Sequence, residues 1–478
     1  MSTRLEVIKQ VRSNYKAIRA ALPWLDCWVS PLESDKAQLP TAFKAPDTDY
    51  ITAVPATDPA AAQAELVICL PGDAIPAGNG LLLIKSSDFD TDAIDKFASE
   101  HADRKVVIVT GYKKVMYFIS QFRELMQKHA NVYLSIANLC NLYAIERLVA
   151  SGLADRLLYG SFMPFLEPDA TMGPLVMSEI DWSVKCDIAG NNLRRLLGKE
   201  VITPAEVKYN RPAKGYAMDA HAHTINPETP QKFEKPEGVM EWSMWADYLD
   251  LVGCNQMIQI PSEANKFPEV ASYEYIKPLM DAANGRIKFM ETFDPRDVAI
   301  SFEHLNKYVD LDTCVGIKIH PATHNTPGSD MRYRELFKFA SEHKKPIMTH
   351  SWAVSNYNPS QFNACPEQFE EHFKAYMDVT FVLGHAGGRP ESFDQTVRLC
   401  KTYPQVYVDV AGDYFNNGVT AGLLEYIGAD RVLFASDAYW MDQRCEMGMF
   451  FMSKASDEDL EKMFYKNAVK VYSWDMVD

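Results

Sequence analysis

The chain has 478 residues and a formal net charge of -16, with 48 Lys and Arg against 64 Asp and Glu. An acidic balance of this size argues against nucleic acid and anionic membranes as partners, because both repel a negative surface. The composition, 47% hydrophobic and 23% charged, is that of a folded protein long enough for two domains. The nine cysteines are scattered without a C-x-x-C pair, so we expect free thiols and a cytoplasmic location.

Residues 1–25 carry charges throughout, which predicts an amphipathic helix and argues against a signal peptide. No later segment has an uncharged apolar run of transmembrane length, so we expect no membrane partner. Short apolar segments typical of strands follow at 25–30, 81–88, 105–112, 131–136 and 153–162. Only two of the 11 histidines, His101 and His129, precede residue 200, so this half is poor in catalytic side chains.

A change in pattern separates this first half from the rest of the chain. The segment 198–215 contains two prolines and has no strong periodicity, which is typical of a connection between domains. We therefore expect one domain over 1–205 and a second over 206–478.

In the second half, short apolar strands alternate with amphipathic helical stretches. The strand candidates are 216–223, 256–261, 287–295, 314–321, 345–352, 379–388, 406–412 and 431–440. Eight strands with helices between them, in about 260 residues, predict an α/β fold of the (β/α)8 TIM-barrel type.

Polar side chains stand at the carboxyl ends of these predicted strands, where TIM-barrel enzymes place their active sites. Each of them alone could be a hydrogen-bonded polar residue of a strand end. Their recurrence on five strands predicts a functional site. They are His221 and His223 on the first strand, Lys318 and His320 on the fourth, His350 on the fifth, His385 on the sixth and Asp437 on the eighth.

The two histidines of the first strand suggest a metal site. Residues i and i+2 of a strand point to the same side, so His221 and His223 offer two imidazoles next to each other. Together with His350 and Asp437 they can hold one divalent ion and leave positions open for water or substrate. Zinc is the first expectation, with manganese and cobalt as alternatives. A bound ion lowers the pKa of water to near neutrality, and Asp437 could accept the proton as a general base.

Further polar residues are expected around this ion. His385 precedes two glycines that permit a tight turn, and we expect it to polarise a substrate carbonyl or shuttle a proton. The alternative for His385 is a structural histidine bonded to the next loop. Lys318 shares a strand face with His320, and it could bind a substrate carboxylate, pair with an acid, or be carboxylated and bridge two ions. We favour a single ion, because nothing else in the sequence requires a second one.

Residues that follow the strand ends complete the predicted pocket. Arg389 could bind an anionic group of the substrate through two hydrogen bonds, or form a surface salt bridge. Tyr439, Trp440 and Trp352 follow candidate ligands, and they are expected either to wall the pocket or to pack beside it. The predicted substrate-binding residues are Lys318, His320, Arg389 and Tyr439.

These motifs together resemble those of the amidohydrolase superfamily, and most closely its amidohydrolase 2 branch of metal-dependent TIM-barrel hydrolases. They are HAH at 221–223, GIKIHP at 316–321, THSW at 349–352, GHAGG at 384–388 and ASDAYW at 435–440. The resemblance covers 214–474 and implies one metal ion held by His221, His223, His350 and Asp437, with His385 as the nearby catalytic histidine. It leaves the reaction open, because the branch is similar both to hydrolases of amides, esters and lactones and to non-oxidative decarboxylases.

The first half of the chain resembles a shortened copy of the second half. The matching segments are 25–30 with 218–223, 81–88 with 315–322 when aligned on Lys85 and Lys318, 105–112 with 345–352, 131–136 with 405–410, and 153–162 with 428–437. Trp28 and Ser30 replace the histidines of the first strand, and Phe162 replaces Asp437. Gly111, one residue beyond the position opposite His350, takes the place of that ligand. The segment 112–131 is too short to hold the sixth strand. We therefore expect a metal-free, incomplete barrel that packs on the catalytic barrel, completes its pocket or mediates oligomerisation.

We expect a metal-dependent hydrolase that uses an activated water on a small-molecule amide, ester or lactone. The alternative is a metal-dependent decarboxylase of an aromatic or unsaturated acid, and a second alternative is a non-catalytic binding protein descended from enzymes. The loops 225–250, 322–332 and 353–375 carry no substrate signature. The expected partner is a small-molecule substrate, and a homodimer is the default assembly.

Overall fold

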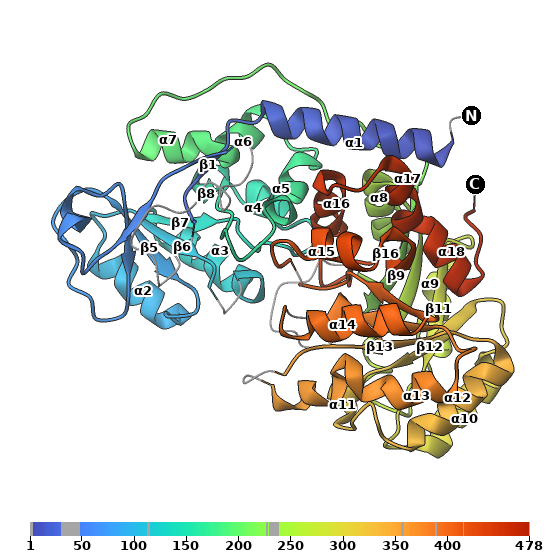
Figure 1. The fold of residues 1–478 in the computed structure, drawn as a ribbon. Coiled ribbons are helices and arrows are strands. Elements are labelled where there is room, and N and C mark those ends of the chain that lie inside the picture. Colours follow the sequence, from blue (N-terminus) through green and yellow to red (C-terminus); the bar gives the residue numbers. More distant parts are fainter. Residues whose placement is uncertain are drawn as a thin grey trace.

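Two parallel β-sheets organise the protein in its computed structural model (Figure 1). The residues that the structure describes are 3–29, 48–111, 115–225, 228, 239–354, 358–387, 390–413 and 415–477. An N-terminal region, from α1 to α7, contains the smaller sheet, and the second region, from β9 onward, is a barrel. The predicted boundary at 205/206 falls between α7 and β9, and the division into two domains stays a prediction.

The barrel consists of eight parallel strands in sequential order, which confirms the predicted (β/α)8 architecture. Backbone bonds from Ala220 N to Phe434 O (3.0 Å) and from Asp437 N to His221 O (2.8 Å) join the first strand to the chain after the last. Each predicted strand overlaps an observed one. The eighth is the most shortened, and the chain turns after it at Asp437, whose φ is 66°. The strands are β9 (Ala217–Thr224), β10 (Cys254–Pro261), β11 (Ile287–Thr292), β12 (Cys314–Ile319), β13 (Ile347–His350), β14 (Phe381–Gly384), β15 (Val406–Asp409) and β16 (Val432–Leu433).

Helices surround the barrel, as the alternation of strand and helix predicts, and α16 among them is buried along almost its whole length. They are α8 (Trp242–Val252), α9 (Ser272–Ala282), α10 (Val298–Tyr308), α11 (Pro321–His324), α12 (Arg332–His343), α13 (Glu370–Ala375), α14 (Pro390–Thr402), α15 (Val419–Tyr426), α16 (Gln443–Met452), α17 (Asp457–Glu461) and α18 (Asn467–Tyr472). Apolar side chains such as Met218, Ile258 and Met348 fill the interior, so the barrel is a packed core with its polar residues at one end.

The smaller sheet has six parallel strands in the order β3-β4-β5-β6-β7-β8, and a separate pair, β1 and β2, lies beside it. A bond from Cys27 N to Tyr159 O (3.0 Å) links the end of β1 to the end of β8. The strands are β1 (Leu25–Asp26), β2 (Asp49–Tyr50), β3 (Ala53–Pro55), β4 (Leu66–Cys69), β5 (Leu81–Lys85), β6 (Val106–Val109), β7 (Val132–Ser135) and β8 (Leu157–Leu158). The helices are α1 (Arg4–Ala21), α2 (Thr91–Glu100), α3 (Ile119–Lys128), α4 (Ala144–Ala150), α5 (Pro168–Val176), α6 (Trp182–Cys186) and α7 (Asn192–Leu196).

Hydrogen bonds of the barrel recur in the N-terminal region at matching positions. Asp219 Oδ1 accepts bonds from His221 N (3.2 Å) and Ser436 N (3.1 Å), and Asp26 Oδ1 accepts them from Trp28 N (2.9 Å) and Ser161 N (3.0 Å). Asn467 Nδ2 donates to the carbonyls of Ala429 and Val432, just as Asn192 Nδ2 donates to those of Ala154 and Leu157. The N-terminal region therefore has the local architecture of a shortened second barrel.

The copy differs from the barrel where the sequence predicts that it should. β6 pairs directly with β7, and Ser135 pairs with Leu158 in the same way as Asp409 pairs with Leu433, so β7 corresponds to β15. Among the residues described between β6 and β7, no strand corresponds to β14. Trp28 and Phe162 occupy the positions of His221 and Asp437, and their rings stack at 5.8 Å. Ser30 lies outside the described residues.

The two regions are packed closely together. Helix α5 approaches α16 so closely that a Cβ at Gly173 would lie 2.0 Å from Arg444 O. The buried guanidinium of Arg444 also forms an ion pair with Glu146 across this contact, with Nη1 2.5 Å from Oε1. Helix α1 runs over α17 (Figure 1), and its Arg12 pairs with Asp457 at 2.8 Å. These contacts hold the copy at a fixed position on the barrel.

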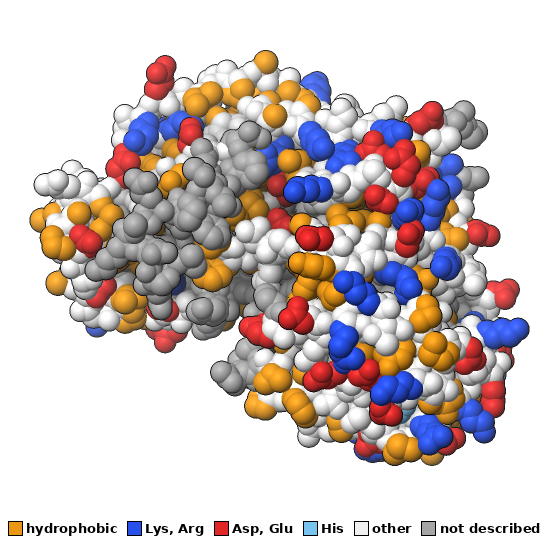
Figure 2. Space-filling view, viewed as in Figure 1, with side chains coloured by type: hydrophobic (Ala, Val, Ile, Leu, Met, Phe, Trp, Pro, Cys, Tyr) orange, Lys and Arg blue, Asp and Glu red, His pale blue; other side chains and the backbone are white. Residues whose placement is uncertain are grey.

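On the face shown in Figure 2, basic and acidic side chains are interspersed over the barrel helices. In the part of the chain that the structure describes, no helix is long and apolar enough to cross a membrane.

Candidate metal centre

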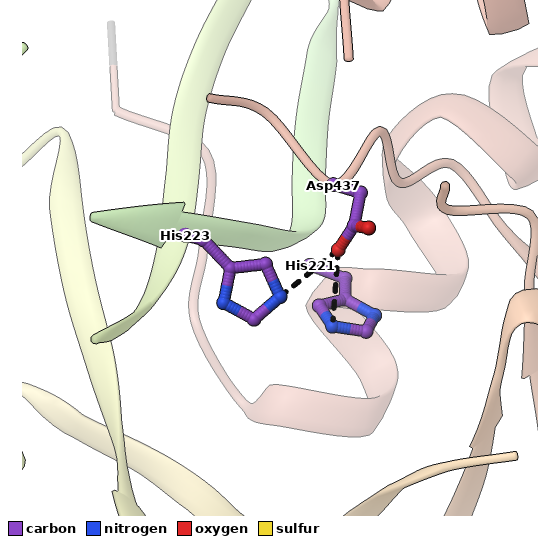
Figure 3. A group of neighbouring side chains, drawn as sticks. All are labelled: His221, His223 and Asp437. Carbon is purple, nitrogen blue, oxygen red and sulfur yellow. Dashed lines mark ion pairs between the residues drawn. The ribbon is translucent and has the colours of Figure 1, made fainter. Parts of the chain in front are cut away.

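Three predicted ligands converge at the carboxyl end of the barrel (Figure 3). His223 Nε2 lies 2.9 Å from Asp437 Oδ1, and His221 Nε2 lies 3.7 Å from the same oxygen. The ligand atoms of all three residues lie within 4.8 Å of one another. Two imidazole nitrogens and one carboxylate oxygen at this spacing form a set of donors suited to one divalent ion.

Hydrogen bonds to the far side of each ring orient the two histidines. His223 Nδ1 lies 2.8 Å from Ile260 O, and His221 Nδ1 lies 3.0 Å from Asp409 Oδ2. A carbonyl and a carboxylate only accept hydrogen bonds, so in each neutral ring Nδ1 carries the proton and Nε2 keeps its lone pair. Both Nε2 atoms are therefore ready to bind a metal, in the arrangement usual for histidine ligands.

Asp437 presents a buried acceptor to the two histidines. Its side chain is 15% exposed, yet Oδ1 is buried and accepts no hydrogen bond from the described residues. Burial raises the pKa of this carboxyl group, but the neighbouring His223, His385 and His221 outweigh burial and hold the pKa well below its usual range. Asp437 is consequently an anion, and its unsatisfied oxygen fits a cation between it and the imidazoles.

Asp409, at the end of β15, is the central residue that the sequence interpretation missed. It is fully buried, and Oδ1 accepts bonds from His385 N (2.7 Å) and Ala411 N (3.1 Å) while Oδ2 faces His221. His221, His385 and Asp409 also form a second cluster with ligand atoms within 4.8 Å. Because the oxygens of Asp409 are engaged in orienting its neighbours, we assign it to holding the ligand His221 rather than to the ion.

Lys318 lies against the same ligand. Its Nζ is 2.8 Å from His221 Nε2, and burial lowers the pKa of the ammonium group to about 8 although Asp409 and Asp437 raise it. A metal ion on His221 Nε2 would replace this contact. A lowered pKa makes that replacement easier, because the lysine can lose its charge. The residues present therefore fit a divalent ion.

His350 lines the same cavity but is turned toward other partners. Its Nε2 lies 2.9 Å from Gln361 Oε1, and its ring stacks on His320 at 4.1 Å. The ligand-atom cluster of His221, His223 and Asp437 does not include it. The role of His350 as a metal ligand stays a prediction.

His385 stands beside the cluster, and its catalytic role stays a prediction. Its ring centroid is 5.0 Å from that of His221 and 4.8 Å from that of His350. The Nδ1 atom lies 2.8 Å from Ala411 O, so in the neutral ring Nε2 is the acceptor. The positive φ of 67° places His385 at the sharp turn that the following glycines indicate.

A cavity of about 380 Å³ opens over these residues. Lys318, His320, Trp352 and Trp440 line it, whereas Tyr439 is not among the lining residues and its side chain is buried. The substrate-binding roles of Lys318 and His320 stay predictions. Arg389 lies outside the described residues. Lining residues without a signal in the sequence are Tyr117, Ser262, Asn265, Lys266, Thr323, Gln361, Gly412, Asp413 and Met441.

A polar cavity at the carboxyl end of a parallel eight-stranded barrel, with a cluster of histidines and aspartate, defines a TIM-barrel enzyme site of the metal-binding type. The sequence profile of the amidohydrolase family, the Amidohydro_2 profile, matches residues 219–474. The chain belongs to this family, and the superfamily resemblance noted in the sequence is confirmed. Comparison with curated proteins finds no match.

Solved structures similar to the barrel include decarboxylases and an uncharacterised protein. A 2,6-dihydroxybenzoate decarboxylase in complex with 2,6-dihydroxybenzoate is 14% identical with a TM-score of 0.43, covering 54% of this chain and 99% of that one. A TIM-barrel protein from Bordetella bronchiseptica is 13% identical with a TM-score of 0.44, covering 54% and 98%. A 5-carboxyvanillate decarboxylase from Sphingomonas paucimobilis is 12% identical with a TM-score of 0.41, covering 54% and 99%.

Proposed function

We propose that this enzyme is a metal-dependent hydrolase acting on an amide, ester or lactone of a small molecule. The observation that supports this most strongly is Asp437 Oδ1, a buried oxygen that faces two imidazole nitrogens and accepts no hydrogen bond from the described residues. A buried acceptor without a donor costs about 1–3 kcal/mol. An ion and a water molecule at this position would remove that cost and supply a nucleophile.

We propose His221, His223 and Asp437 as the residues that hold the ion, with His350 as a candidate fourth ligand and zinc preferred over manganese or cobalt. The ion would lower the pKa of a bound water and polarise the carbonyl of the substrate. Asp437 directs Oδ1 at the imidazoles, so Oδ2 is the atom that can accept the proton of the attacking water.

His385 is suited to moving the second proton of the reaction. With Nδ1 donating to Ala411 O, the neutral ring can accept a proton at Nε2 and then donate it to the leaving group. After it has accepted that proton, the same nitrogen can hold the developing negative oxygen of the substrate. The hydrogen bond from His385 N to Asp409 Oδ1 fixes the backbone of His385 beside the end of β15.

A decarboxylase is the second candidate, and Lys318 is the observation that favours it. This lysine is buried in the cavity with its Nζ beside His221, and Lys266 also lines the cavity. Ammonium groups here can hold the carboxylate of a substrate acid until it leaves as neutral carbon dioxide. In this reaction His385 would take up a proton from solvent at Nε2 and deliver it to the carbon atom that loses carbon dioxide.

Oxygen and carbon isotopes separate the two candidates. The zinc-loaded full chain is incubated with panels of amides, esters, lactones and carboxyl-labelled aromatic acids in ¹⁸O-enriched water. Hydrolysis places ¹⁸O in the acid product, and Asp437→Asn should abolish it. Release of labelled carbon dioxide with no ¹⁸O in the organic product would overturn the hydrolase proposal in favour of the decarboxylase. Turnover that is equal in the metal-free protein would contradict both.

A further inference from the structure

The carboxyl end of the N-terminal sheet is filled by its own side chains. The rings of Trp28 and Phe162 stack at 5.8 Å where the barrel has a metal ligand and its carboxylate partner, and Trp28 is fully buried. Lys85 Nζ lies 5.8 Å from the Trp28 ring, at the position that Lys318 has beside His221. Among the described residues, these side chains take the place of the ligand cluster of the barrel, so the loops that follow the strands of the copy are available for another role.

One of these loops reaches the active-site cavity of the barrel. Tyr117 belongs to the short helix η3 (Val115–Phe118), which follows β6, and it lines the cavity together with His385 and Asp413. The Tyr117 hydroxyl donates a hydrogen bond to Asp413 Oδ2 at 3.2 Å. A side chain of the copy is therefore bonded directly to the loop that follows β15 of the barrel.

That loop controls the position of His385. Ala411 O accepts the hydrogen bond from His385 Nδ1 at 2.8 Å. A Cβ on Gly412, whose φ is 84°, would lie 2.9 Å from His385 Nδ1 and 3.3 Å from Asp437 Oδ2, so the backbone here lies against both side chains. A movement of residues 411–413 would consequently shift the hydrogen bond that sets the tautomer of His385.

A second contact holds the same loop further along. Glu167 N donates to Phe415 O at 2.7 Å, and Asn417 N donates to Phe165 O at 2.9 Å, on either side of an antiparallel bridge between Leu166 and Asn416. Residues 165–167 follow β8 in the copy, as the segment after Asp437 follows β16 in the barrel. Two loops of the copy thus hold one loop of the barrel at two points.

We propose that the N-terminal region acts as a clamp on residues 411–413 and 415–418 and that Tyr117 is a positioning residue for His385. The hydroxyl of Tyr117 holds Asp413, the backbone of 411–413 holds Nδ1 of His385, and Nε2 is left facing the cavity. The inference rests on the proposed function only for the catalytic use of His385. The clamp itself depends on geometry that either reaction would share.

Amide hydrogen exchange of the zinc-loaded full chain, without substrate, tests the clamp. Loss of one hydrogen bond in Tyr117→Phe should speed exchange of the amides of 411–413 about two- to tenfold. Nitrogen-15 spectra of histidine-labelled protein, with His385→Gln to assign the signal, should show that the Nδ1 proton of His385 exchanges faster with water. Asp413→Ala removes the acceptor of this bond, so adding Tyr117→Phe to Asp413→Ala should change the exchange little further.

Tyr143→Phe is the matched control. Its hydroxyl also joins the N-terminal region to the barrel, at 3.4 Å from Asp247 Oδ2, but Tyr143 is not among the residues that line the cavity. Unchanged exchange in Tyr117→Phe, or the same increase in Tyr143→Phe, would overturn the proposal. Neither measurement requires turnover, so both can be interpreted even if the hydrolase proposal is wrong.

Discussion

Asp409→Asn should weaken metal binding without unfolding the protein. In the native site Oδ1 accepts bonds from the backbone of His385 and Ala411, and Oδ2 faces His221 Nδ1 at 3.0 Å. Asparagine can keep the first oxygen, and its amide group then points at His221 Nδ1. Two donors cannot face each other, so His221 must move its proton to Nε2. In the opposite rotamer, the side-chain NH2 group of the asparagine would face the backbone N–H groups of His385 and Ala411, which are also donors.

The tautomer change removes the lone pair from the atom that we assign to the ion. Loss of a residue that orients a metal-binding histidine typically costs about 10- to 100-fold in affinity, or about 1.4–2.7 kcal/mol. We therefore expect the dissociation constant for Zn²⁺ to rise by a factor in this range. Asp409→Ala should have a larger effect, because it also leaves two buried backbone donors without an acceptor.

A competition titration with a chromophoric zinc chelator measures this affinity on the full chain. Asp413→Asn serves as the control, since Asp413 lines the same cavity without contacting His221 Nδ1 in the described structure. Thermal denaturation of the metal-free variants shows whether the fold is preserved. An Asp409→Asn protein that keeps both wild-type stability and wild-type zinc affinity would refute the assignment of Asp409 to His221.

Three further predictions concern the pH dependence of stability, the packing of the two regions and the cavity lysine. Burial raises the pKa of Asp26 from 3.8 to about 6. The folded state therefore favours the protonated carboxyl group of Asp26. The free energy of unfolding has its full contribution from this group below the pKa of the unfolded chain, and this contribution is lost as the pH rises through about 6. In urea unfolding, Asp26→Asn should reduce the change in unfolding free energy across this pH range by up to about 3 kcal/mol. Parallel plots of unfolding free energy against pH for the two proteins would contradict this prediction. Gly173→Ala should destabilise the protein by about 1–3 kcal/mol, because the new Cβ would lie 2.0 Å from Arg444 O. An unchanged thermal midpoint would mean that α5 and α16 can separate freely. Lys318→Met should weaken calorimetric binding of benzoate about tenfold or more. Lys185 is the matched control, because it is a buried lysine that lies outside the cavity and donates to Val176 O. Lys185→Met should leave benzoate binding unchanged, and equal effects of the two substitutions would rule out an anion-binding role for Lys318.

The barrel and its ligand cluster could be predicted because both follow from local patterns. Strand alternation places His221 and His223 at one strand end, and the order of the motifs places Asp437 beside them. The repeated register likewise predicted that the copy lacks one strand. These features depend on periodicity and chain order, which the sequence contains directly.

Residues that act through non-local contacts could not be predicted. Tyr117 and Gln361 lie in short 3-10 helices of connecting segments, and connections have no periodicity that indicates a direction for a side chain. Asp409 left a weaker signal, since it is the acidic residue at the end of the apolar strand VYVD. The bulky residues at 439 and 440 are distinguished only by the turn after β16, which buries Tyr439 and leaves Trp440 at the cavity.

The copy inside the chain helps to separate residues that build the fold from residues that do chemistry. Asp219 and Asn467 have counterparts with the same hydrogen bonds, Asp26 and Asn192, so these side chains serve the barrel end itself. His221, Asp437 and Asp409 are replaced together by Trp28, Phe162 and Ser135. Loss of all three from one copy is expected if they work as a unit, because a metal ligand without its carboxylate partners has no function to preserve.

Lys318 follows a different pattern from these three residues. Its counterpart Lys85 is still present in the copy, where it lies over the Trp28 ring. A lysine at this position is therefore compatible with a site that holds no metal, and its presence alone assigns no chemistry to the barrel. The case for the metal centre depends instead on the residues that the copy has lost, and among these Asp409 is the one whose role a single amide substitution can test.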